Sequence, residues 1–226
     1  MRLRPGRATT LSLTAYRAVL NDDIEFIASG AAVNAGFFQN TGRTLRQGID
    51  ATFATRTEKL SFTAAYGYVR AVYLTPFRML SPNNSSRDAG DEIQVEAGNA
   101  IPGIARSQLK FLAEWFAAAR TSLGFGWAWY GRQYARGDEN NRDVNGALPS
   151  YGVAQAFARY RAGRDWQVSL KVNNLFDRRY SSFGILGANF FAGPGNTYDA
   201  AAARPELFLA PGAPRSVWLA LQYEPR

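Results

Sequence analysis

The sequence predicts an all-β protein, an antiparallel up-and-down meander of roughly nine strands that forms part of a transmembrane β-barrel. Three observations lead to this fold class. Apolar and polar residues alternate along segments of about ten residues, which places successive side chains on opposite faces of a strand. Short turns and long loops join these segments in alternation, and 14% of the residues are aromatic. Outer-membrane barrels combine short periplasmic turns, long extracellular loops and aromatic girdles.

The strands follow from the alternation. In residues 121–134 the apolar side chains share one face: Leu123, Phe125, Trp127 and Trp129. The preceding segment repeats the pattern with Leu109, Phe111, Ala113 and Trp115. Applied along the whole chain, the alternation predicts strands at residues 9–20, 24–29, 43–56, 59–72, 105–117, 121–134, 150–161, 165–175 and 214–223.

The connections between these strands alternate in length. Short turns are predicted at residues 21–23, 57–58, 118–120 and 162–164, and long loops at residues 30–42, 73–104, 135–149 and 176–213. Long loops within a compact soluble domain count against that assignment unless they have a function. A membrane barrel with its long loops at one end is therefore favoured over a soluble β-sandwich.

Charged residues also favour a membrane-facing surface. They lie almost wholly on one face of each well-defined strand, and an arginine on the other face at the bilayer midplane would cost about 2–4 kcal/mol. Arg17 and Arg70 are exceptions, because each falls on the apolar parity of its strand. Arg70 lies near the long-loop end, where its long side chain can reach water or lipid phosphate.

The composition excludes several kinds of chemistry. The chain has no cysteine and no histidine, which removes disulfides, thiolate sites and the commonest general base. Arginines supply most of the net charge of +8 and are spread along the chain, so no nucleic-acid partner is predicted. We find no catalytic constellation and no phosphate-binding glycine loop, and we expect no enzymatic activity, no cofactor and no metal ligands. The acidic segment 137–143 lacks the glycine and terminal glutamate of a calcium loop and is predicted to be solvated.

The sequence predicts neither a secretory signal nor a transmembrane helix. Residues 1–7 are basic but lack the apolar stretch of a secretory signal. No run of about 18 apolar residues predicts a transmembrane helix.

Three segments resemble the C-terminal half of TonB-dependent outer-membrane receptors. Residues 40–50 are similar to a family motif that leads into a strand and include Asn40, Gly42 and Gly48. Pro102-Gly103 is similar to the family's lead into the next such strand. Residues 172–180 match the family's Asn-Leu-Phe-Asp-x-x-Tyr signature with Asn173, Asn174, Leu175, Phe176, Asp177 and Tyr180.

The third motif is expected to shape the exit of its strand rather than to touch a ligand. Asp177 can accept backbone N–H bonds there. Two departures from the family pattern are Asp50 in place of a glutamate and the residues that follow Tyr223, where the family ends on an aromatic residue.

The resemblance implies TonB-dependent import of a scarce nutrient, such as a ferric siderophore or other metal chelate. It implies the outer membrane of a Gram-negative bacterium, with the TonB complex, membrane lipid and lipopolysaccharide as partners. The family's plug domain, TonB-contacting segment and signal sequence are not visible, and its barrels have about 22 strands. We therefore expect residues 1–226 to be a partial barrel domain. Alternatives are a passive porin-like channel, a soluble basic β-domain and an inactive truncated product.

Candidate ligand-binding residues are Tyr130, Arg132 and Tyr134, which share the inward parity at the long-loop end of one predicted strand. An arginine between two tyrosines can pair with an anionic chelate and pack its apolar body. The same spacing suits an aromatic rim on a wet barrel wall, which is the commoner arrangement.

Overall fold

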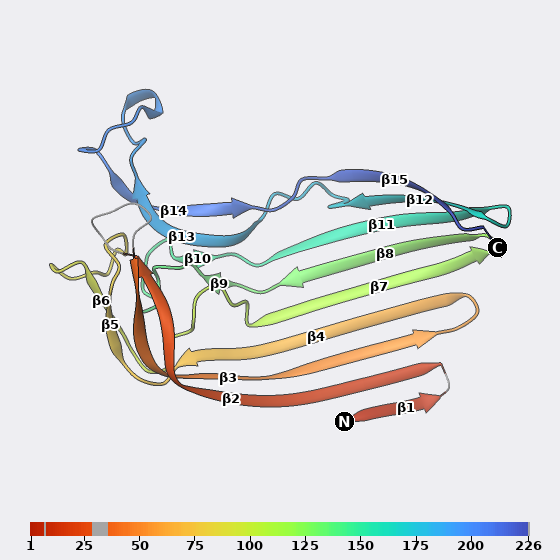
Figure 1. The fold of residues 1–226 in the computed structure, drawn as a ribbon, viewed down its shortest axis with the longest axis horizontal. Coiled ribbons are helices and arrows are strands. Elements are labelled where there is room, and N and C mark those ends of the chain that lie inside the picture. The colour runs from red at the N-terminus through yellow and green to blue at the C-terminus, as the bar shows by residue number, and fades with distance from the viewer. Residues whose placement is uncertain (7, 29–35, 226) are drawn as a thin grey trace.

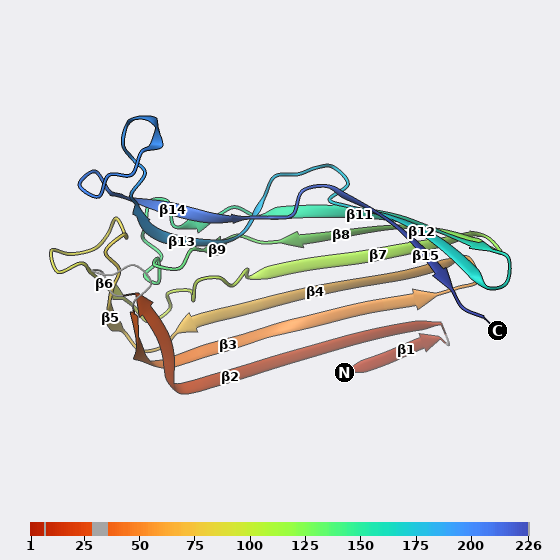
Figure 2. The ribbon, with the colours of Figure 1, turned by 45° about the horizontal axis from the view of Figure 1, so that its top comes forward.

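The computed structural model describes residues 1–6, 8–28 and 36–225. Its main feature is a nine-stranded antiparallel sheet in the order β1-β2-β3-β4-β7-β8-β11-β12-β15, drawn in Figure 1. These strands are Arg2–Gly6, Thr9–Ala28, Gly36–Arg56, Leu60–Tyr73, Ser107–Ala118, Thr121–Tyr130, Tyr151–Ala162, Trp166–Asn173 and Ser216–Tyr223. Figure 2 shows a single curved layer. The predicted all-β meander is confirmed, and β1 and β15 are its two edges.

The predicted alternation of connection lengths is also present. The short turns after β3, β7 and β11 lie at one end of the sheet, and the long connections after β4, β8 and β12 lie at the other end (Figure 1). No helix among the described residues is long and apolar enough to cross a membrane. A single short 3-10 turn at Pro194–Asn196 is described in the last loop.

The prediction was wrong in the first quarter of the chain. The turn expected at residues 21–23 is a β-bulge, so the predicted strands 9–20 and 24–29 form one strand, β2. Asp22 has a positive φ of 55° at the bulge, the conformation that turn residues also adopt. The loop expected at 30–42 is strand from Gly36 onward, and residues 29–35 lie outside the described residues. The short strand β1 was missed.

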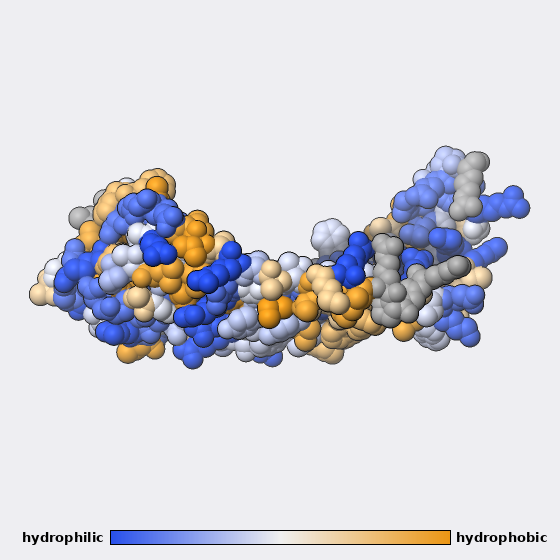
Figure 3. Space-filling model, turned by 90° about the horizontal axis from the view of Figure 1, so that it is seen from below, coloured by the Kyte–Doolittle hydropathy of each residue, from blue (hydrophilic) through white to orange (hydrophobic). Residues whose placement is uncertain are grey.

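The long loops carry small hairpins that the alternation did not predict. They are β5 with β6 (Phe77–Leu80, Glu92–Val95), β9 with β10 (Gln133–Tyr134, Ala147–Leu148) and β13 with β14 (Ser181–Asn189, Arg204–Pro211). The β5–β6 hairpin packs on the upper ends of β2 and β4 and forms a buried apolar cluster of Ile27, Ala71, Tyr73, Met79, Ile93, Val95 and Ile101. The compact hydrophobic core therefore lies under the long loops, whereas the middle of the molecule is one sheet thick (Figure 3).

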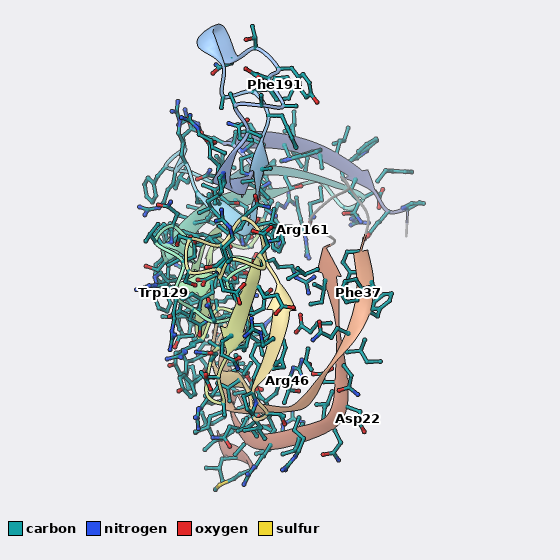
Figure 4. All side chains as sticks on the ribbon, turned by 90° about the vertical axis from the view of Figure 1, so that its left-hand side faces the viewer. Asp22, Phe37, Arg46, Trp129, Arg161 and Phe191 are labelled. Carbon is teal, nitrogen blue, oxygen red and sulfur yellow. The ribbon has the colours of Figure 1, made fainter. Side chains whose placement is uncertain are left out.

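The main sheet has two chemically different faces. The two apolar rows of β7 and β8 are in register, with Leu109 opposite Trp129, Phe111 opposite Trp127 and Trp115 opposite Leu123. Trp115 is 52% exposed and Leu123 is 43% exposed, so this face is not a sealed core. Figure 4 places Trp129 on the convex side of the sheet and Arg46 and Arg161 on its concave side. An apolar convex face and a charged concave face are what a barrel wall between lipid and a wet lumen requires.

Candidate functional site

Three tyrosines from different segments stack on the concave face near the long-loop end. Tyr130 ends β8 and lies directly opposite Tyr151, the first residue of β11. Their ring centroids are 5.1 Å apart, and the Tyr151 ring lies 4.6 Å from that of Tyr180 in the last long loop. All three rings are partly exposed. The stack therefore offers aromatic surface to the space that the concave face encloses.

A cation lies beside this stack. The ammonium nitrogen of Lys110 on β7 is 5.4 Å from the centroid of the Tyr130 ring. Lys110 is exposed, and no ion pair to it occurs within the described residues. An unpaired ammonium beside stacked phenol rings can attract a flat anionic molecule through charge and through ring contact. We call Lys110, Tyr130, Tyr151 and Tyr180 the tyrosine–lysine site.

The predicted trio of Tyr130, Arg132 and Tyr134 is divided by the structure. β8 ends at Tyr130, and Tyr134 belongs to the separate loop strand β9, opposite Ala147 of β10. Arg132 is exposed and lies 5.7 Å from the centroid of the Tyr134 ring. The expected single strand to residue 134 was therefore wrong, and Tyr130 has Tyr151 and Lys110 as ring neighbours instead.

Sequence reasoning missed two members of the site, Tyr151 and Lys110. Lys110 falls on the polar parity of its strand, and Tyr151 falls at the beginning of the predicted strand 150–161. The missing information was the register of β8 against β11, which sets Tyr130 beside Tyr151.

The third sequence motif closes the base of the last long loop. Asn174 is 3% exposed and has a positive φ of 46°. Its amide donates hydrogen bonds to the carbonyls of Arg178 (2.9 Å) and Ala213 (3.0 Å), and its side-chain oxygen accepts the Arg178 N–H. Asp177 accepts the backbone N–H of Arg215 at 3.0 Å.

Four other residues of the third motif have separate positions. Asn173 ends β12, the Leu175 N–H donates to the carbonyl of Ala154, and Phe176 is 73% exposed. Tyr180 joins the tyrosine–lysine site. The motif thus has two parts: hydrogen bonds of Asn174 and Asp177 that clamp the base of the last long loop, and the ring contact of Tyr180.

The first two motifs occupy special backbone positions. Gly42 has a positive φ of 74° opposite the β2 bulge, and its N–H donates to the side-chain oxygen of Asn40 at 2.7 Å. A Cβ at Gly48 would approach the hydroxyl of Tyr16 to 2.6 Å. Pro102 is buried, and Gly103, with a φ of 75°, donates its N–H to the carbonyl of Tyr134 at 2.9 Å.

The acidic loop is packed rather than solvated, contrary to the prediction. Asp138 is 0% exposed and Glu139 is 4% exposed, and each has one carboxylate oxygen without a hydrogen-bond partner among the described residues. Burial raises the pKa of Glu139 to about 7 and that of Asp138 to about 6. Backbone N–H groups of Arg142 and Asp143 donate to the other oxygen of Asp138, which holds the loop in a tight turn. Within the described ranges, no group of three or more acidic, His or Cys side chains is arranged to hold a metal ion.

The open sheet, apolar on one face and charged on the other, defines a section of a transmembrane β-barrel wall. Comparison with known proteins agrees with this class of protein. Residues 1–175 match the family described as TonB dependent receptor-like, beta-barrel, and the chain belongs to this family. Members of this family sit in the outer membrane.

Two curated relatives come from Pseudomonas aeruginosa. The Metal-pseudopaline receptor CntO is 25% identical over 189 residues, which are 83% of this chain and 22% of the relative. The Ferric enterobactin receptor is 27% identical over 117 residues, 46% of this chain and 16% of that protein. The chain thus spans less than a quarter of the length of either relative.

Solved structures share the fold. The siderophore receptor PiuA from Acinetobacter baumannii aligns with a TM-score of 0.67 at 18% identity, over 96% of this chain and 26% of that one. The ferric yersiniabactin uptake receptor FyuA from Yersinia pestis aligns with a TM-score of 0.65 at 15% identity, over 98% of this chain and 28% of that one. Both alignments cover nearly all of this chain but only about a quarter of the receptor to which it is compared.

Proposed function

We propose that this chain forms the C-terminal section of the wall of an outer-membrane receptor that binds a ferric siderophore or related metal chelate and admits it under TonB control. Family membership and the names of the relatives support nutrient uptake. The observation that carries the ligand class is the tyrosine–lysine site. Its ammonium and three stacked rings suit an anionic chelate that has flat aromatic arms.

The position of the site suits capture from outside the cell. Tyr130 and Tyr151 lie where strands give way to the long loops, and Tyr180 belongs to the last of those loops. In a barrel with long loops outside, a ligand entering from the medium would meet these rings first on this section of the wall. TonB itself would act through a plug domain, which is part of the proposed complete receptor.

We further propose that additional strands complete the barrel. The outer edges of β1 and β15 have no strand neighbour in the described sheet. Each unpaired backbone group in hydrocarbon costs several kcal/mol, so a nine-strand open sheet is unfavourable in a bilayer. Flanking strands of the same receptor would remove both edges and place the tyrosine–lysine site inside a closed lumen.

The test measures how tightly two ferric complexes bind to the purified receptor that contains this chain. Quenching of the receptor's intrinsic fluorescence is the readout. The probes are the ferric complex of catechol, which is aromatic and anionic, and ferric citrate, which is anionic only. We expect tighter binding of the catechol complex, and a loss of about tenfold for Lys110→Gln, comparable to one charge-assisted contact. Lys171→Gln removes another lysine with the same inward parity, on β12, and should leave binding unchanged.

Two outcomes would contradict the proposal. Equal affinity of wild type and Lys110→Gln for the catechol complex would remove the site from ligand binding. Uptake of radioactive iron that persists when TonB is deleted from the host would instead favour the passive channel. Binding and energy coupling are therefore tested separately.

A further inference from the structure

The convex face carries one group of charges that neither the core nor the tyrosine–lysine site explains. Along the main-sheet strands from β2 to β15, Arg17 and Arg70 are the only charged side chains at register-paired positions of this face, counting the described residues. They come from two different strands that are 53 positions apart in the sequence. The strand register nevertheless brings them to one place.

Arg17 and Arg70 flank a single residue of the strand between them. Arg17 on β2 lies directly opposite Gln47 on β3, and Gln47 lies directly opposite Arg70 on β4. Neighbouring residues in such a row have Cα atoms about 5 Å apart, so the two arginine Cα atoms are separated by roughly 10 Å. Both guanidinium groups can therefore extend over Gln47 toward one anion. Arg43 follows on β3 beyond Leu45 and adds a third cation at the bulge.

No carboxylate among the described residues pairs with these charges. Arg17, Arg43 and Arg70 are exposed, and none of them takes part in an ion pair with a described residue. Asp22 at the nearby bulge accepts a hydrogen bond from the amide of Asn40 instead. Cations on a lipid-facing wall are tolerated near the interface rather than at the bilayer centre. The missing partner is thus expected in the lipid headgroups.

Aromatic residues mark the headgroup level on the same strands. Tyr66 and Tyr68 precede Arg70 on the convex face of β4 and are 42% and 40% exposed. Tyr66 lies opposite Leu109, and Leu109 lies opposite Trp129, so the tyrosine and the tryptophan share one row. Exposed Tyr and Trp gather at the membrane–water boundary. Arg17 and Arg70 come next toward the long loops. In an outer-membrane barrel the long loops are extracellular, so this is the side of the outer leaflet.

We propose that Arg17, Gln47 and Arg70 form a binding site for the phosphate groups of the phosphorylated glycolipid in the outer leaflet. The arginine forks can each donate two hydrogen bonds to a phosphate, and the Gln47 amide can donate a third contact between them. Acyl chains of the same lipid would lie along the apolar convex face below. The site is independent of which nutrient the receptor imports.

The experiment uses the receptor that contains this chain, in phosphatidylcholine nanodiscs, with lipid A as the probe and native mass spectrometry as the readout. Lipid A carrying its phosphates should bind, and lipid A with its phosphates removed should not. Arg17→Gln combined with Arg70→Gln should weaken retention by about thirtyfold, and each single substitution by about fivefold. The control pair Arg56→Gln and Arg161→Gln removes two concave-face charges and should have no effect.

Three results would overturn the proposal. The first is equal retention of lipid A by the double variant and the wild type. The second is displacement of lipid A by millimolar inorganic phosphate, which would indicate a site for soluble anions. The third is equally strong retention of phosphatidylglycerol, which would remove the glycolipid preference.

If the double variant does not fold, the single variants and the Arg17→Lys, Arg70→Lys pair test the proposal instead. The lysine pair should retain most of the lipid A binding. Unchanged catechol-complex binding in these variants separates this site from the proposed function.

Discussion

Asn174 donates a hydrogen bond of 3.0 Å to the carbonyl of Ala213, a residue 39 positions further along the chain. The same amide donates to the carbonyl of Arg178, so one side chain joins the two ends of the last long loop. Because Asn174 is 3% exposed, water cannot easily replace these bonds. The geometry of this loop, and with it the position of Tyr180, therefore depends on a residue that is not one of the three stacked rings.

We predict that Asn174→Ala destabilises the receptor by about 1–3 kcal/mol, because it removes the hydrogen bonds that a buried side chain makes to both ends of the loop. Thermal unfolding would measure the loss, and faster hydrogen exchange in residues 178–213 would locate it. The neighbouring change Asn173→Ala is the control, since the Asn173 amide makes one long contact of 3.4 Å to the Ser216 hydroxyl. Equal effects of the two changes would show that the clamp is not important.

The two faces of β7 give a second prediction. Phe111 lies on the convex face opposite Trp127, and its neighbour Leu112 has the opposite parity. Phe111→Arg should cost up to about 2–4 kcal/mol, the cost of a lipid-facing arginine at the bilayer midplane. Leu112→Arg, one position away, should be tolerated by the wet lumen. The folded fraction recovered from outer membranes measures both, and an equal yield of the two variants would contradict the assignment of the faces.

The alternation of polar and apolar residues was sufficient to predict most of the main sheet. It failed where the backbone departs from regular pairing. Asn21, Asp22 and Asp23 have the composition of a turn, and a bulge needs the same residue types because Asp22 adopts a positive φ. The β5–β6 hairpin could not be predicted from alternation because it is held by contacts with the upper ends of β2 and β4, which are distant in the sequence.

Parity alone predicted only part of the candidate site. It placed Tyr130 on the inward face, but the partners of Tyr130 depend on the register between strands. Tyr151 is 21 positions from Tyr130 across a loop, and Tyr180 reaches the stack from a different loop. A similar limit applied to Asp138 and Glu139, whose charges suggested solvent, whereas packing against Asn84 and Ser81 buries the loop. Side-chain type predicts chemistry more readily than it predicts neighbours.

The position of Tyr180 gives a third prediction. A Cβ on Gly212 would overlap the Tyr180 ring, and the Gly212 N–H donates to the Tyr180 carbonyl at 2.8 Å. Gly212→Ala should therefore push the ring away from Tyr151 and weaken binding of the catechol complex. In a Tyr180→Ala background the same glycine change should cost almost nothing. A double-mutant cycle measures the coupling, and additive effects would mean that Gly212 does not position the ring.

The buried loop acids give a prediction about pH. The pKa of Glu139 is raised from 4.5 to about 7, mainly by burial, and that of Asp138 is raised from 3.8 to about 6. The nearby charges that affect Glu139 are Glu25 and Arg136, which act in opposite directions. Because the folded loop favours the protonated carboxyls, their contribution to stability is fully present below the unfolded pKa values and is lost as pH rises through the folded values. We expect the loop at residues 137–146 to loosen between about pH 4 and pH 7, the range from the unfolded to the folded pKa values.

Hydrogen exchange of this loop, corrected for the intrinsic effect of pH, measures the change. Glu139→Gln replaces the acid with a neutral side chain of the same shape and should remove much of the loosening at high pH. Glu206→Gln is the matched control, because Glu206 lies in the β13–β14 hairpin and its pKa is lowered by hydrogen bonds from Asn189 and Arg204. If the loop of the Glu139→Gln variant still loosened as much as the wild type, burial of Glu139 would not be the cause, and Asp138→Asn would be the next change to test. If protection instead increased with pH in the wild type, the assigned direction of both pKa shifts would be wrong.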